Sequence, residues 1–128
     1  MNDATSDLVQ HDLANDVLVL TPKVDQMRDT DVCYSIHDEM TDYVQQIEHR
    51  RVVIDMQKVN FVSSTGILAF LNLRRALSET DEKVIFCNLS SALAGMFKIC
   101  KLISENPDDP TPFSSVDTLE SALTASFS

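Results

Sequence analysis

The feature that most constrains the fold is an alternation of short apolar runs with segments of helical periodicity. Val52-Val53-Ile54 is an unbroken β-branched run, as expected for a central strand covered on both faces. Helical patterns lie before and after it, and a second apolar run at residues 83–87 is followed by another helical pattern. This alternation predicts an α/β fold with a mostly parallel sheet.

The individual elements follow from local patterns. Residues 7–10 and 17–20 predict an opening antiparallel hairpin, with residues 11–16 between the two strands. Periodicity predicts helices over residues 31–48, after Gly66, over residues 90–101 and through residues 119–123. Phe113 is expected in a last short strand, and Ser115 or Asp117 can cap the final helix. The expected architecture is one α/β domain with an antiparallel N-terminal strand and about four helices.

Length and charge exclude several classes of protein. The chain has 128 residues, enough for one domain, and we expect residues 8–125 to be structured and residues 1–6 to be flexible. Its 20 acidic and 10 basic side chains give a net charge of −10, which repels nucleic-acid phosphates and anionic membranes. With only 2 glycines, neither glycine-rich nucleotide-binding motif can be written.

The sequence also indicates a compartment. No apolar run approaches the ~20 residues that cross a bilayer, and the first residues lack the segments of a signal peptide. Cys33, Cys87 and Cys100 are odd in number, never form C-x-x-C, and lie in apolar stretches. We expect them to be buried thiols in a reducing compartment, and the protein to be cytoplasmic without membrane insertion.

Motifs for catalysis and metal binding are missing from the sequence. The histidines are His11, His37 and His49. None has a cysteine or carboxylate at metal-ligand spacing, so we expect exposed helix or loop positions for them. Asp25, Asp29 and Asp31 lack the glycine and glutamate of a calcium loop and are interpreted as loop and helix-cap acids. The sequence predicts no metal, no cofactor and no enzymatic activity.

The segment Ser63-Ser64-Thr65-Gly66 joins a loop after the central strand to the start of a helix. Free backbone N–H groups and the helix dipole favour an anion at such a point, including a phosphate attached to the protein. A simpler interpretation is that Ser64 or Thr65 only caps the helix. Composition alone leaves both interpretations open.

Three segments carry a resemblance to a known family. They are Val52-Val53-Ile54-Asp55, residues 59–67, and Lys83-Val84-Ile85-Phe86-Cys87-Asn88-Leu89. Together they resemble the STAS domain, specifically bacterial anti-sigma factor antagonists, whose signature is a strand ending in aspartate, an apolar-x-aromatic step and an Asp-Ser-Ser/Thr-Gly turn before a helix. The match is good over residues 50–103 and looser over residues 8–48, where Val24-Asp25 resembles the family's aspartate after its second strand.

The resemblance implies a binding module that sequesters an anti-sigma factor serine/threonine kinase and so frees a sigma factor. Phosphorylation at the turn reverses the binding, and a phosphatase resets it. The phosphoacceptor falls on Thr65, with Ser64 as the second choice. Ser63 stands where the family has aspartate, and Lys101-Leu102 stands where members often have glycine-leucine. The expected partner-binding residues are Asp25, Asn60, Ser63, Ser64, Gly66 and Ile67.

Two alternatives stay open. A STAS subunit could dock constitutively onto a transporter or signalling complex, for example a lipid-transport ABC system, with Thr65 as a contact residue and cap. A response-regulator receiver domain has a similar length and sheet, and its phosphoacceptor aspartate would be Asp55. The sequence leaves the oligomeric state open between a monomer and a weak dimer.

Overall fold

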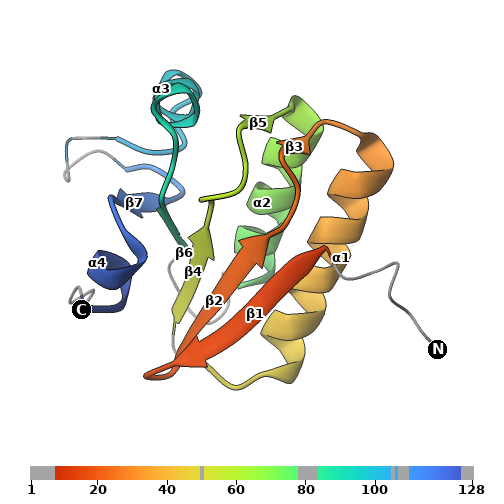
Figure 1. Cartoon of the computed structure of the whole chain (residues 1–128), viewed down its shortest axis with the longest axis vertical. Helices are drawn as coiled ribbons and strands as arrows, with labels where there is room; N and C mark the ends of the chain where they lie inside the picture. The colour runs from red at the N-terminus through yellow and green to blue at the C-terminus, as the bar shows by residue number, and fades with distance from the viewer. Residues whose placement is uncertain (1–7, 50, 78–83, 105, 107–109, 125–128) are drawn as a thin grey trace.

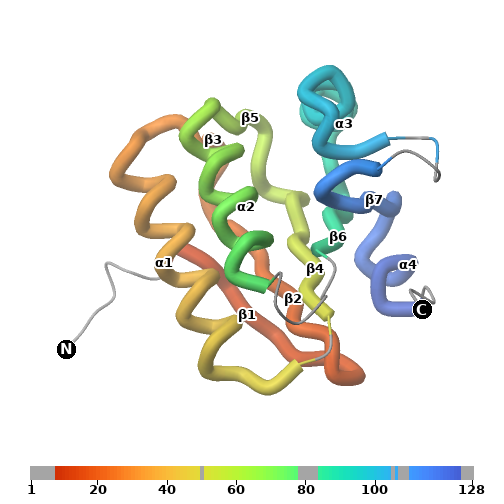
Figure 2. Tube along the Cα trace, turned by 180° about the vertical axis from the view of Figure 1, so that it is seen from behind, coloured from red at the N-terminus to blue at the C-terminus, as the bar shows by residue number. Residues whose placement is uncertain are grey.

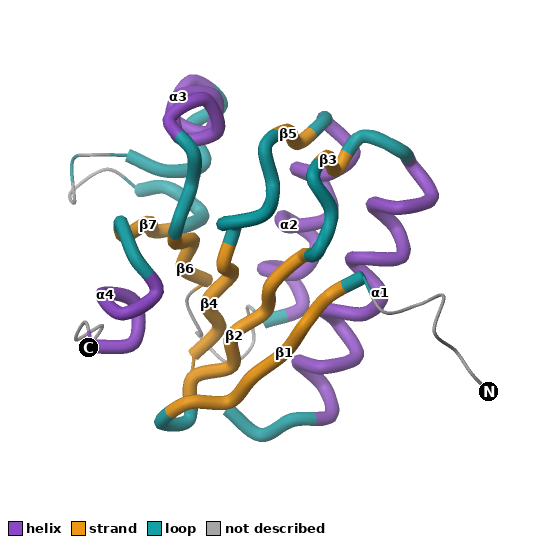
Figure 3. Tube along the Cα trace, viewed as in Figure 1, coloured by secondary structure: helices purple, strands orange, loops and turns teal. Residues whose placement is uncertain are grey.

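A five-stranded sheet forms the centre of the computed structural model, in the order β1-β2-β4-β6-β7 (Figure 3). Its strands are β1 (Val9–Ala14), β2 (Val17–Pro22), β4 (Arg51–Asp55), β6 (Val84–Cys87) and β7 (Ser114–Val116). β1 is antiparallel to β2, and the other neighbours are parallel. The structure describes residues 8–49, 51–77, 84–104, 106 and 110–124. The predicted α/β class, the parallel crossovers and the antiparallel N-terminal strand are confirmed.

Within these described ranges, the helices around the sheet are α1 (Thr30–Gln46), α2 (Ser64–Ala76), α3 (Ser91–Ile99) and α4 (Leu119–Thr124). Seen from behind, α1 and α2 lie next to each other in front of the strands (Figure 2). Alternate residues of β4 face opposite ways, as the period of a strand requires. Val52 and Ile54 belong to the larger core, which α1, α2 and α3 also line, whereas Val53 belongs to the smaller core on the side of α4. The predicted central strand is therefore β4, buried on both faces.

Phe86 of β6 lies at the centre of the larger core. Its ring is 5.1 Å from Phe70 of α2, 5.2 Å from Phe97 of α3 and 4.9 Å from Phe113, measured between centroids. All four rings are at most 2% exposed. Tilted and edge-on aromatic contacts of this kind add to the stabilisation from apolar burial. These ring contacts link β6 to α2, to α3 and to the segment before β7.

The N-terminal hairpin is confirmed, but its predicted bounds were wrong. His11 to Ala14 belong to β1 rather than to the connection, and the turn is only Asn15-Asp16. Both turn residues have positive φ, 52° and 66°, which asparagine and aspartate tolerate better than most residues. A two-residue turn of this kind matches the twist of the strands on either side.

Other local predictions need correction. Thr118, not Ser115 or Asp117, caps α4, because its hydroxyl accepts the N–H of Ser121 at 3.0 Å. Ser115 lies within β7, where its backbone is extended. Phe113 precedes β7 and is buried against the core instead of lying in the strand.

The predictions for one cysteine and one histidine were also wrong. Cys33 and Cys87 are buried as expected, but Cys100 is exposed because it follows the last residue of α3. His11 lies in a strand rather than a helix or loop, and its ring stacks on Tyr43 of α1 at 4.2 Å between centroids. The flexible segment expected at residues 1–6, and residues 7 and 83 of the predicted strands, lie outside the described residues.

A second sheet was not predicted. It consists of β3 (Gln26–Met27) and β5 (Phe61–Val62), which pair in parallel. Strands of two residues are too short to show a period of alternation, so sequence patterns give no signal for them. In the part of the chain that the structure describes, no helix has the length and apolar character that crossing a bilayer needs.

The core assignment predicts unequal effects for two leucines of α2. Leu73 is fully buried and Leu68 is 55% exposed. Leu73→Ala should lower the free energy of unfolding by about 2–5 kcal/mol, because it leaves a cavity, whereas Leu68→Ala should change it by less than ~0.5 kcal/mol. Urea denaturation followed by circular dichroism measures both values. Equal losses in the two variants would contradict the packing described here.

Candidate functional site

The small sheet brings the starts of α1 and α2 to one end of the molecule (Figure 1). Its register pairs Gln26 with Phe61 and Met27 with Val62. The N–H of Ser63 continues the pairing by donating to the carbonyl of Met27 at 2.8 Å. β3 is followed within a few residues by α1, and β5 by α2. The amino ends of the two helices therefore lie on the same surface.

Ser63 is the N-cap of α2. Its backbone is extended, with φ −79° and ψ 175°, and its hydroxyl accepts the N–H of Gly66 at 3.4 Å. The prediction that Ser64 or Thr65 caps the helix was therefore wrong, because both already have helical backbone. Ser64 is exposed and Thr65 is half-buried. The hydroxyls of Ser64 and Thr65 are therefore not needed to cap the helix.

Gly66 is buried where the turn meets the small sheet. A Cβ atom built on it would lie 2.7 Å from Cγ1 of Val62 and 3.2 Å from both Cβ and the carbonyl oxygen of Met27. Side chains do not approach so closely, so the requirement for glycine here is one of space. Its neighbour Ile67 is half-buried and packs on the core. These contacts fix the direction in which α2 leaves the turn.

Asp25 and Asn60, which lie on the loops before β3 and β5, are hydrogen-bonded to each other. The N–H of Asn60 donates to the carbonyl of Asp25 at 2.7 Å, and the side-chain amide of Asn60 donates to the carboxylate of Asp25. Both side chains are exposed. The structure therefore brings together all of the predicted site residues: Asp25, Asn60, Ser63, Ser64, Thr65, Gly66 and Ile67.

Sequence reasoning missed the Arg28–Phe61 pair at the same surface. The guanidinium of Arg28 lies 4.9 Å from the centroid of the Phe61 ring, a cation–π distance. The carbonyl of Arg28 is 3.5 Å from the hydroxyl of Ser63. The aromatic residue before the turn was visible in the sequence, but nothing local indicated that Arg28 covers it.

The elements of the site carry several exposed apolar side chains. The exposed large hydrophobic residues of the described chain are Leu13, Tyr34, Phe61, Leu68 and Ile99. Three of these five lie on or next to the elements of the site: Phe61 on β5, Tyr34 near the start of α1 and Leu68 near the start of α2. Exposed apolar side chains around polar groups are typical of surfaces that bind other proteins.

The thiol of Cys33 lies beneath the turn in the first turns of α1. Burial is the main cause that raises the pKa of this thiol above its usual value, and the charge of Asp29 also raises it, whereas a hydrogen bond with the side chain of Ser63 acts in the opposite direction. The thiol therefore stays neutral at physiological pH. It packs in the core below the N-cap, in surroundings that favour the unreactive thiol form.

Asp55 ends β4, as expected, but its carboxylate is used for structure. It is 2% exposed and accepts the backbone N–H of Gln57 at 3.1 Å, the side-chain amide of Gln57 at 3.1 Å and that of Asn88 at 2.9 Å. Within the described residues, no group of three or more histidine, cysteine or acidic side chains could hold a metal ion. A receiver needs an accessible aspartate as its phosphoacceptor, so the burial and bonding of Asp55 count against that alternative.

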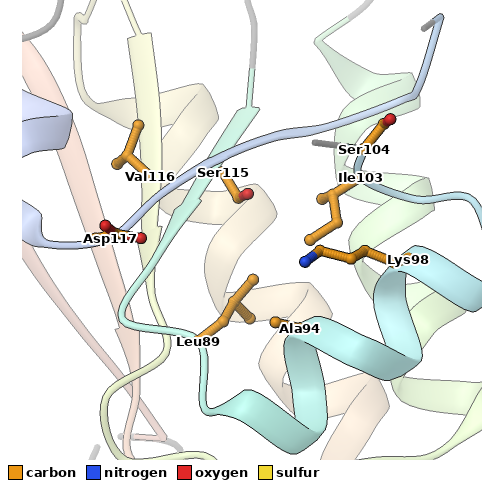
Figure 4. A pocket seen from close by; sticks show the side chains of 8 residues that line it. All are labelled: Leu89, Ala94, Lys98, Ile103, Ser104, Ser115, Val116 and Asp117. Carbon is orange, nitrogen blue, oxygen red and sulfur yellow. The ribbon is translucent and has the colours of Figure 1, made fainter. Parts of the chain in front are cut away.

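A cavity of about 350 Å³ lies away from the turn, between α3 and β7 (Figure 4). It is lined by Leu89, Ala94, Lys98, Ile103, Ser104, Ser115, Val116 and Asp117. Lys98 and Asp117 carry opposite charges, so the lining has no excess charge of either sign. None of the predicted site residues reaches it.

Comparisons with known proteins agree with this architecture. The family model described as STAS domain matches residues 13–119. No curated protein sequence matches the chain. Among solved structures, an anti-sigma-factor antagonist (STAS) domain protein from Planctomyces limnophilus superposes with a TM-score of 0.71 at 19% identity, covering 90% of this chain and 93% of that one.

Two further structures share the fold. The Bacillus cell fate determinant SpoIIAA in its phosphorylated form has a TM-score of 0.63 at 17% identity, over 90% of this chain and 96% of that one. A sulfate transporter family protein from Wolinella succinogenes has a TM-score of 0.63 at 12% identity, over 87% and 84%. At these identities the likeness is one of fold.

The packing of Gly66 predicts opposite effects for the two glycines of the chain. Gly66→Ala should lower the free energy of unfolding by about 1–3 kcal/mol, because the new methyl group meets Val62 and Met27. Gly95→Ala, inside α3 with nothing within 4 Å, should raise it by up to ~1 kcal/mol. Chemical denaturation of both variants tests this. A Gly66→Ala protein as stable as the wild type would contradict the close approach.

Proposed function

Because the chain belongs to the STAS domain family, we propose that it is a phosphorylation-switched binding module. In this proposal it sequesters an anti-sigma factor that is also a serine/threonine kinase, and so frees a sigma factor for transcription. Phosphorylation by that kinase ends the binding, and a phosphatase restores it. The module acts by binding in the cytoplasm, without enzymatic activity, cofactor, nucleic acid or membrane insertion.

The observation that carries the proposal is that two hydroxyl residues begin α2 without capping it, on elements that also carry exposed apolar side chains. Ser64 and Thr65 begin α2, and capping does not use their hydroxyls. Phe61, Tyr34 and Leu68 are exposed on β5, α1 and α2, the elements whose ends meet there. A kinase needs an accessible hydroxyl, and a protein partner needs apolar contact area. This end of the molecule offers both.

Thr65 is the proposed phosphoacceptor, and Ser64 is the alternative. A phosphate on Thr65 would add about −1.5 to −2 charges at neutral pH, next to unpaired N–H groups and the positive end of the α2 dipole. The isolated protein therefore tolerates the phosphate without refolding. A partner packed closely over Thr65 would have to desolvate it, which costs several kcal/mol and lowers the affinity by orders of magnitude.

The remaining residues have distinct proposed roles. Ser64 contacts the partner directly, since its side chain is exposed beside the acceptor. Asp25 and Asn60 present a hydrogen-bonded polar pair at the rim of the surface. The other three residues act through position: Ser63 caps α2, Gly66 lets the turn approach β3, and Ile67 anchors the helix.

A second candidate function keeps the fold but omits the switch. The likeness to a sulfate transporter family protein favours a STAS subunit that docks constitutively onto a transporter. The same apolar surface would then be a permanent contact, and Thr65 would be a contact residue. The two functions differ in one observable, because only the first requires phosphate to abolish binding.

The proposed switch predicts the behaviour of two variants at one position. Thr65→Glu should bind the anti-sigma kinase from the same cells at least ~10-fold more weakly than Thr65→Ala, a difference of ~1.4 kcal/mol, because the carboxylate brings charge into the contact. Isothermal titration calorimetry measures both affinities. Equal affinities would contradict the electrostatic mechanism.

Ser64→Glu and Ser64→Ala are the matched controls, since they place the same change one residue away. If the Ser64 pair shows the larger difference, the acceptor is Ser64. Mass spectrometry of the protein purified from its own cells then identifies the phosphorylated residue directly. Absence of phosphate under all growth conditions, together with binding to a transporter subunit, would favour the docking function instead.

A further inference from the structure

β1 is an edge strand of the main sheet, and its open side lies next to α1. An edge strand presents N–H and C=O groups that another strand can bind, so stable proteins protect such edges. The other edge strand, β7, has only three residues, whereas β1 has six. β1 is therefore the longer of the two edge strands of the main sheet.

The register of the hairpin determines which groups of β1 point outward. Its two-residue turn makes Ala14 and Val17 a hydrogen-bonded pair, and the pattern alternates along the strand from there. The backbone groups of Val9, His11 and Leu13 therefore point away from β2. These are the groups that a further strand would need.

The backbone N–H of Val9, which points away from β2, is hydrogen-bonded to the side chain of Glu39 of α1. Its carboxylate accepts the N–H of Val9 at 3.1 Å, and both of its oxygens lie 3.0 Å from the N–H of Leu8. One helical turn later, the hydroxyl of Tyr43 lies 3.5 Å from the carbonyl of Val9. One helix thus covers both outward groups of this residue.

The far end of the open edge is covered from within β1. The carboxylate of Asp12 accepts the N–H of Leu13 at 2.9 Å. His11 lies between the two covered positions, with its ring stacked on Tyr43. The outward N–H groups at both ends of β1, those of Val9 and Leu13, are therefore hydrogen-bonded to carboxylates.

We infer that Glu39 is a clamp that keeps the β1 edge closed to a second copy of this chain. A carboxylate fixed on a backbone donor must be displaced before another strand can use that donor. With the clamp in place the chain stays monomeric. When the clamp is removed, two copies can pair through β1 in antiparallel orientation.

The chemistry of β1 favours one symmetric register for this pairing. Centring it on His11 places Val9 opposite Leu13 of the other copy and the amide of Gln10 opposite the carboxylate of Asp12. It also covers Leu13, which is 47% exposed. Centring the pairing on Asp12 would instead bring two carboxylates face to face, which is unfavourable. The favoured register needs the N–H of Val9, which Glu39 holds, and the N–H of Leu13, which Asp12 holds. Because this register places the amide of Gln10 opposite Asp12, the Asp12 carboxylate gains another donor when it releases Leu13, so Glu39 is the group that blocks the pairing.

The test compares two variants of α1 that lose the same charge. Glu39→Ala should form a dimer in a concentration series by analytical ultracentrifugation, and its Leu8 and Val9 amides should exchange with solvent ~10-fold faster in the dilute monomer. Asp42→Ala, an exposed position on the same helix, should stay monomeric with unchanged exchange. Glu39→Gln keeps one carbonyl acceptor and should show a weaker tendency to dimerise.

His11→Pro in the Glu39→Ala background identifies the surface involved. Proline removes an outward N–H without removing a bond to β2, so the fold should remain and the dimer should be lost. Circular dichroism confirms that each variant is folded. A folded Glu39→Ala protein that stays monomeric at every concentration, or a dimer that survives His11→Pro, would overturn the inference.

Discussion

The parallel pairing of β3 with β5 is the interaction on which the site depends. It joins two loops that are far apart in sequence and extends into the bond from the Ser63 N–H to the Met27 carbonyl. Because each short strand leads directly into a helix, pairing the strands also aligns the helix starts. The space for this approach exists because Gly66 has no side chain. A sheet of two short strands thus positions a surface built from both helices.

Most of the fold could be predicted from the sequence because it rests on periodic patterns. The run Val52-Val53-Ile54 and the helical spacing on either side of it indicated the sheet, its centre and its parallel crossovers. The missed features depend on one or two residues or on distant contacts. β3 and β5 are too short to show a period, and the contact of Arg28 with Phe61 joins separate loops. The turn motif indicated the position of the site, but its hydrogen bonds were needed to identify Ser63 as the cap.

Serine at the N-cap has an electrostatic consequence for the proposed switch. Ser63 caps α2 as an aspartate could, but it brings no charge. Residues 63–66 are therefore formally neutral, and phosphate on Thr65 would take them to about −2. The unphosphorylated turn can enter an apolar contact at low desolvation cost, and the phosphorylated turn cannot. In the proposed switch the contrast between the two states is thus concentrated in one side chain, and the surrounding fold is expected to stay the same.

The most direct test of this account is an NMR comparison of the unmodified chain with a chain carrying phosphothreonine at position 65, introduced during synthesis. The account predicts amide shift changes confined to the first turn of α2 and the neighbouring β3 and β5 residues. The Ser63 and Asn60 amides, which bond to Met27 and Asp25, should keep their protection from solvent exchange. Loss of that protection, or shift changes extending through the main sheet, would show that phosphate acts by rearranging the fold and would contradict the account.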